Sequence, residues 1–93
     1  MTQTDRVALA MESLQIDFTN GNPVEENFEG LMTAVYLSTN ADCYIAFDTS
    51  ANTDDFILGS GDGVVAFEKA QFTRLSVKGV NGSGTLYVIA CRV

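Results

Sequence analysis

Length, composition and charge limit what this chain can be. Its 93 residues allow one domain with one hydrophobic core. Twelve Asp and Glu against five Lys and Arg give a net charge of −7, which repels phosphate groups, so we expect no nucleic-acid and no membrane partner. The absence of histidine removes the commonest general base and transition-metal ligand, so we expect no enzyme, no catalytic residue and no cofactor.

The first 32 residues are expected to form an N-terminal arm and a first strand. Helical spacing is visible at Val7, Met11, Leu14 and Phe18, whereas Leu14, Ile16 and Phe18 alternate as in a strand. We favour an extended arm that ends in a strand at about 13–18, and the helical alternative for 5–18 stays open. A Gly and a Pro break the pattern at 20–23, and three glutamates then predict a solvated loop.

Residues 33–93 are expected to form the folded core. Strand patterns bounded by turn residues recur at short intervals, as is typical of sandwiches and barrels. The strands expected at 34–39 and 43–48 are joined by a tight turn at 40–42, and those at 72–80 and 85–93 form a hairpin across the Asn-Gly-Ser-Gly turn at 81–84. The fold class predicted is all-β: a small antiparallel β-sandwich or jelly-roll-like barrel with an N-terminal arm.

The last expected strand is apolar on both faces. Leu86, Val88 and Ala90 point one way, while Tyr87, Ile89 and Cys91 point the other, because successive strand side chains alternate. One face can fill the core, so the other needs a second layer, supplied by the N-terminal arm or by another chain. We therefore expect an assembly protein that forms a homo-oligomer, either a dimer or a trimer.

Two further residue groups are candidates for chemistry. The carboxylates of Asp48, Asp54, Asp55 and Asp62 could bind calcium or form an acid pair, but we favour backbone capping within turns. Cys43 and Cys91 lie inside strand patterns and lack metal-ligand spacing, so we expect two buried thiols, with a disulfide left open.

Aromatic side chains suggest a binding surface as well as a core. Tyr36, Tyr44 and Tyr87 could stack on a sugar, as in small carbohydrate-binding modules, although the chain has no Trp. Protein contact is the favoured interpretation, since interfaces are rich in Tyr. The expected contact residues are Tyr87 and Ile89, with Tyr44 as their neighbour, and Val7, Leu9 and Met11 are expected to anchor the arm.

Residues 33–93 resemble the small β-sandwich virion proteins of tailed bacteriophages, and the segments 34–48 and 75–89 carry the resemblance. The shared pattern is a strand, an Asn/Asp turn and a Tyr-Ile-Ala-Phe strand, followed by a closing Gly-Ser-Gly-Thr-Leu-Tyr-Val segment. The resemblance implies a capsid cement or decoration protein that bridges neighbouring major capsid subunits, with a head–tail connector or tail component as the alternative. It implies location in the virion after synthesis in the host cytoplasm, which agrees with the lack of an apolar leader or of an apolar run long enough to span a bilayer.

Overall fold

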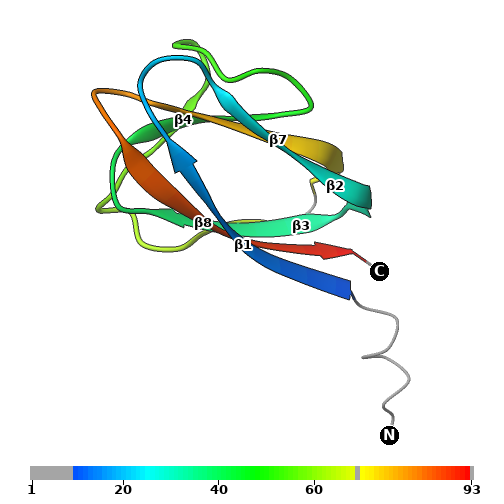
Figure 1. Ribbon diagram of the computed structural model, residues 1–93. Coiled ribbons are helices and arrows are strands. Elements are labelled where there is room, and N and C mark those ends of the chain that lie inside the picture. Colours follow the sequence, from blue (N-terminus) through cyan, green and yellow to red (C-terminus); the bar gives the residue numbers. More distant parts are fainter. Residues whose placement is uncertain (1–9, 69, 93) are drawn as a thin grey trace, which may run out of the picture.

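Two antiparallel β-sheets pack face to face in the computed structural model, which describes residues 10–68 and 70–92 (Figure 1). Sheet A contains four strands in the order β1-β8-β3-β6, and sheet B contains four in the order β2-β7-β4-β5. The strands are β1 (Ala10–Phe18), β2 (Val24–Met32), β3 (Ala34–Thr39), β4 (Cys43–Phe47), β5 (Phe56–Leu58), β6 (Val65–Phe67), β7 (Phe72–Gly79) and β8 (Gly84–Arg92). This arrangement confirms the predicted all-β sandwich.

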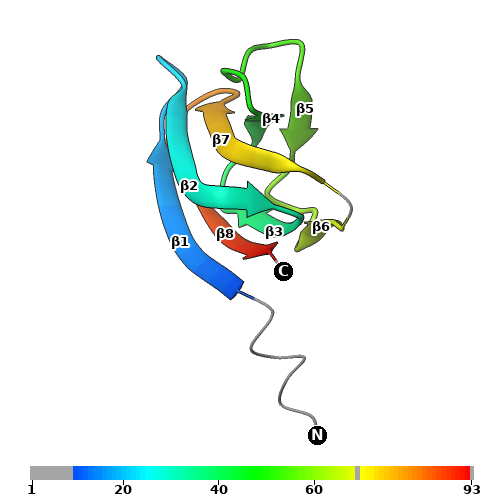
Figure 2. The ribbon, with the colours of Figure 1, turned by 90° about the vertical axis from the view of Figure 1, so that its right-hand side faces the viewer.

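The strand order is that of a jelly roll. The chain passes from one sheet to the other at almost every connection, and only β4 and β5 are consecutive strands that pair with each other. An eight-stranded jelly roll consists of two Greek keys whose strands form two packed sheets, and the present strand order has this form. Figure 2 shows the consequence for the edges: β1 and β2 run along one side of the sandwich, and the short β5 and β6 run along the other.

The core lies between the sheets and follows from the alternation of side chains. In β8 the residues Leu86, Val88 and Ala90 are fully or almost fully buried, as predicted. Sheet B contributes Leu75 and Val77 of β7 from the opposite side. Aromatic rings fill one end of this core through the edge-to-face or tilted pairs Phe28–Phe72, Phe47–Phe72, Phe47–Phe67 and Phe56–Phe67.

The predicted hairpin of 72–80 with 85–93 is wrong, and the two strands joined by the 40–42 turn do not pair with each other either. β7 and β8 lie in different sheets, and so do β3 and β4, so the connections at 80–83 and 40–42 are corners between sheets. Hydrogen bonds tie these corners together at one end of the sandwich: Asn40 N–H donates to the Thr85 carbonyl (3.3 Å), and Val80 N–H donates to the Asp42 carbonyl (3.0 Å). Turn residues such as Asn and Gly are suited both to a hairpin loop and to a corner between sheets, because the chain reverses direction in both.

The N-terminal region also differs from the prediction. β1 pairs with β8 along its whole length, from Ala10 opposite Arg92 to Phe18 opposite Gly84, so a helix over 10–18 is excluded. Residues 24–32 form a strand that pairs with β7, whereas we expected a loop. Residues 10–32 therefore belong to the sandwich, and nothing in this region lies over the outer face of β8.

Candidate functional site

The outer face of sheet A is almost free of charge, and we call it the uncharged face. Its residues are Met11, Ser13 and Gln15 of β1, Ala34, Tyr36 and Ser38 of β3, Ala66 of β6, and Tyr87, Ile89 and Cys91 of β8. They form rows across the sheet: Ile89 lies between Ser13 and Tyr36, and Tyr87 lies between Gln15 and Ser38. Among the outward positions of these four described strands, the single charged residue is Asp17, at one corner.

Large apolar side chains on this face are open to solvent. Tyr87 is 41% exposed, Ile89 is 38% exposed and Met11 is 60% exposed. A shallow groove of about 180 Å³ lies beside Tyr87 and Ile89, and its lining also includes Tyr36 and Val64. The second apolar face predicted for the last strand is thus present: the described part of the chain leaves Tyr87 and Ile89 open to solvent, whereas Cys91 on the same face is only 8% exposed.

The structure brings some of the predicted contact residues together and separates others. Met11 lies opposite Cys91 on the uncharged face, in the same sheet as Tyr87 and Ile89. The expectation that Tyr44 neighbours Tyr87 is wrong, because Tyr44 lies in sheet B, opposite Lys78 and Ile57. Val7 and Leu9 lie outside the described residues.

Sequence reasoning missed the residues that flank β8 on this face. Tyr36 comes from β3, and Ser13 and Gln15 come from β1. The alternation within β3 indicates that Tyr36 points away from Val35 and Leu37, but it does not indicate which strand lies beside it. That information depends on pairing between distant parts of the chain.

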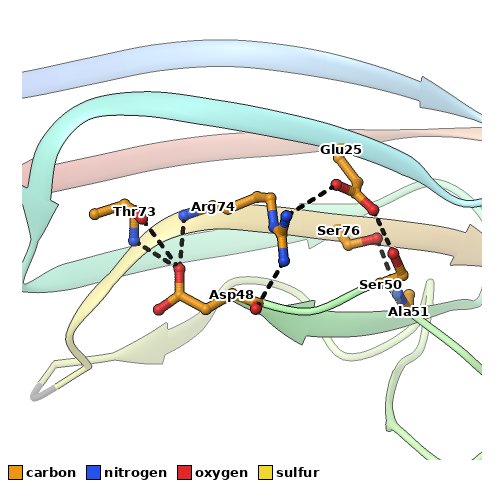
Figure 3. Close-up of polar contacts among 7 residues, drawn as sticks. All are labelled: Glu25, Asp48, Ser50, Ala51, Thr73, Arg74 and Ser76. Carbon is orange, nitrogen blue, oxygen red and sulfur yellow. Dashed lines mark hydrogen bonds and ion pairs between the residues drawn. The ribbon is translucent and has the colours of Figure 1, made fainter.

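The outer face of sheet B carries charged side chains and is partly covered by a loop, in contrast to sheet A. The loop after β4 folds over β7, where Ala51 N–H donates to the Ser76 hydroxyl at 2.9 Å and Ser76 is fully buried (Figure 3). The Arg74 guanidinium holds this loop and β2 together: it donates to the Asp48 carbonyl at 2.8 Å and lies 3.5 Å from the Glu25 carboxylate.

Asp48 anchors the start of this loop. Its backbone is in the left-handed region at φ 60°, which Asp tolerates better than most residues. The carboxylate accepts hydrogen bonds from the backbone N–H groups of Thr73 (2.9 Å) and Arg74 (3.0 Å). These bonds, that from Thr73 first, lower the pKa of the Asp48 carboxyl group below its ordinary value.

Two of the other three aspartates considered for calcium binding, Asp55 and Asp62, cap backbone N–H groups within turns. Asp55 accepts a hydrogen bond from Asn52 N–H at 2.8 Å, and Asp62 accepts one from Gly59 N–H at 2.7 Å. The favoured prediction, backbone capping, is confirmed for these two residues. In residues 10–68 and 70–92, no group of three or more His, Cys, Asp or Glu side chains is placed to hold a metal ion.

Both cysteines are buried and free, as the favoured prediction stated, and the disulfide alternative is wrong. Cys43 points into the core from sheet B, whereas Cys91 lies on the outer side of sheet A. Burial is the main cause that raises the pKa of the Cys43 thiol to about 11, so it stays protonated and unreactive at neutral pH.

No helix in the described ranges 10–68 and 70–92 is long and apolar enough to cross a membrane. Comparison of the whole chain with protein-family models, with curated proteins and with solved structures gave no significant match.

Proposed function

We propose that this protein is a structural protein of a tailed-bacteriophage virion, most closely a capsid cement or decoration protein. Its partner is the major capsid protein or another virion protein, and the uncharged face is the contact surface. The function is binding without a chemical step, and the protein is located in the virion after synthesis in the host cytoplasm. The family resemblance of residues 34–48 and 75–89 gives the partner class, and the uncharged face gives the place of contact.

The observation that supports a protein partner is the contrast between the two outer faces. A chain with net charge −7 keeps almost all charge away from the outward positions of β1, β3 and β8 and exposes Tyr87, Ile89 and Met11 there. Depletion of charge with exposed Tyr and aliphatic residues is typical of the centre of protein interfaces. The jelly-roll fold is compatible with this role, since it occurs among viral capsid domains, but fold alone does not decide function.

A cement protein acts by mass action. Each contact that forms only in the assembled shell lowers the free energy of that state relative to dissociated subunits. Many equivalent sites on one shell multiply a weak single contact. The proposal therefore needs only a modest affinity for each face.

The test is co-sedimentation of the purified protein with shells of the cognate capsid. Ile89→Asp places a charge in the centre of the uncharged face and should reduce shell binding at least tenfold. Ile57→Asp is the matched control, because Ile57 is 50% exposed on the outer face of sheet B. Equal loss of binding in both variants, or no loss in either, contradicts the proposed contact face.

The copy number per particle separates the cement role from the alternative. A cement protein is present in numbers comparable to the capsid subunits, whereas a head–tail connector or tail component is present in far fewer copies. Quantitative mass spectrometry of purified virions measures this ratio.

A carbohydrate-binding module is the second candidate, favoured by the groove on the same face. Tyr36 and Tyr87 line it together with the amide of Gln15 and the hydroxyl of Ser38. Aromatic rings beside such polar groups can stack on and orient a sugar. Saturable glycan binding that Tyr87→Ala abolishes would support this candidate, and its absence across a glycan panel would remove it.

A further inference from the structure

We propose that two copies of this chain join through β1, which pairs antiparallel with β1 of the second copy and makes one continuous sheet from both copies of sheet A. β1 pairs with β8 on one side, and no strand in residues 10–68 and 70–92 pairs with its other side. An unpaired strand edge is a template for another strand. This inference does not depend on the capsid partner proposed above.

The hydrogen-bonding pattern identifies the backbone groups that are free for this pairing. Thr85 directs its carbonyl toward β3, where it accepts from Asn40 N–H. Alternate residues of an antiparallel strand direct their backbone groups to opposite sides, so Leu86, Val88 and Ala90 direct theirs toward β1. The backbone groups of β1 that point toward β8 are those of the paired residues Ile16, Leu14 and Glu12. The N–H and C=O groups of β1 that point away from β8, and that no strand in residues 10–68 and 70–92 pairs with, are therefore those of Met11, Ser13, Gln15 and Asp17.

β1 is the long edge that is suited to pairing. β5 and β6, at the far side of the sandwich, have three residues each. β2 has nine residues, but its pairing shifts register between Asn27 and Met32, and Gly30 bends it at φ 93°. Exposed Glu25 and Glu29 add like charges to that edge. Bulges and charges protect edge strands, whereas the pairing of β1 with β8 is regular throughout.

The register that pairs the whole of β1 has its two-fold axis at Leu14. Ser13 then pairs with Gln15 of the second copy, and Met11 pairs with Asp17 of the second copy. Glu12 lies opposite Ile16, so no two carboxylates face each other directly. Leu14, which is half-buried at the open edge, gains Leu14 of the second copy as a neighbour on the core side.

This pairing also extends the uncharged face. Ser13 and Gln15 lie at the border of that face, next to Ile89 and Tyr87. In the dimer, Ser13 and Gln15 lie at the centre of the combined uncharged face. The grooves of the two copies lie on the same side of the continuous sheet. The pairing therefore gives two aligned contact faces without covering either of them.

The first experiment removes one free donor from the edge. Ser13→Pro deletes the N–H that faces the second copy and leaves the bonds to β8 untouched, since edge strands tolerate Pro at such positions. Ser13→Ala keeps the N–H and is the matched control. Light scattering from micromolar to millimolar protein should show a dimer for the natural chain and Ser13→Ala, and at least a tenfold weaker dimer for Ser13→Pro, with an unchanged circular dichroism spectrum.

The second experiment tests the register. In the proposed register, a cysteine at position 14 lies directly opposite the same cysteine of the second copy. The two form a pair without backbone hydrogen bonds, in which the Cα atoms are about 4.5 Å apart, and a disulfide can bridge this distance. Leu14→Cys should crosslink under mild oxidation, whereas Ser13→Cys, whose two copies lie two positions apart along the strands, should not.

Three results would overturn the proposal. These are a natural chain that stays monomeric at millimolar concentration, a trimer, which a two-fold β1 pairing does not produce, and a dimer that Ser13→Pro leaves intact. Failure of shell binding alone would refute the proposed function and not this dimer.

Discussion

Gly84 is a residue at which a single added methyl group should damage the fold. It begins β8 at the corner where the chain enters sheet A, opposite Phe18. A Cβ at this position would lie 2.7 Å from Ala41 Cβ, 2.7 Å from Phe18 Cζ and 2.8 Å from Asn40 Oδ1. Phe18 is almost fully buried and Ala41 has no flexible side chain, so neither can move away easily.

The cost of Gly84→Ala can be built from these contacts. Overpacking a close-packed site costs about 1–3 kcal/mol. Displacing Asn40 weakens the hydrogen bond from Thr85 N–H to its side-chain oxygen (2.8 Å), which costs about 1 kcal/mol. The smaller entropy of the unfolded chain offsets at most about 1 kcal/mol. The free energy of unfolding should therefore fall by about 1–3 kcal/mol, which for a domain of this size lowers Tm by on the order of 5–20 °C.

Thermal and urea unfolding, followed by circular dichroism, measure this difference. Gly82→Ala is the control in the same connection, because a Cβ there meets nothing within 4 Å and should leave stability unchanged or slightly higher. If Gly84→Ala melts within about 2 °C of the natural chain, the corner packing described here is incorrect, and with it the sheet-to-sheet connection at 80–83.

Three other measurements test the covered face of sheet B and the core. Ser76→Ala leaves the buried Ala51 N–H without its acceptor and should cost about 1–3 kcal/mol in urea unfolding, and an unchanged midpoint would contradict the loop placement. Asp48→Asn keeps a residue that tolerates positive φ but removes the carboxylate whose pKa is depressed. The natural chain should be the more stable one at neutral pH, and its advantage should shrink as the pH falls below 3.8, the ordinary pKa of Asp; a difference independent of pH would refute the assigned hydrogen bonds. The Cys43 thiol, with its pKa raised from 9.0 to about 11, should react with a thiol reagent at pH 8 at least about 100-fold more slowly than in the unfolded chain, and rapid labelling of the folded protein would show that it is not buried.

The inward and outward faces of the strands could be predicted from the sequence because they depend on a local rule. Alternation with a period of two assigns Leu86 and Val88 to the core and Tyr87 and Ile89 to the outside, and the burial of each residue agrees. No knowledge of the partner strands was needed for this result.

Strand pairing could not be predicted in the same way. β1 and β8 lie side by side although almost the whole chain separates them. The turn at 81–84 has the residues of a hairpin loop, yet it connects two sheets, because Gly84 fits against Phe18 and Ala41 at the corner. Turn composition specifies that the chain reverses, whereas long-range packing decides which strand it meets next.

β2 shows how charge can hide a strand. Glu25 and Asn27 face outward and Phe28 faces the core, which is ordinary alternation. The register shift and the left-handed Gly30 then interrupt the pattern before Met32 returns to the core. In the sequence, the three glutamates of this segment show no regular strand alternation and therefore suggest a loop. In the fold they are charges on an edge strand, where charge protects against pairing with other chains.

The two proposals concern different parts of one sheet, and their consequences combine. The uncharged face would bind the shell, and the free edge of β1 would bind a second copy and place two such faces in the same plane. A dimer bound through one face holds its second face close to the neighbouring capsid subunit, which raises the effective concentration for the second contact. Ser13→Pro should therefore weaken binding to shells even though Tyr87 and Ile89 are intact, whereas Ile89→Asp should weaken shell binding and leave the dimer unchanged. The opposite pattern, with loss of the dimer in Ile89→Asp and no effect of Ser13→Pro, would mean that the face joins the copies and that β1 is simply the end of the sheet.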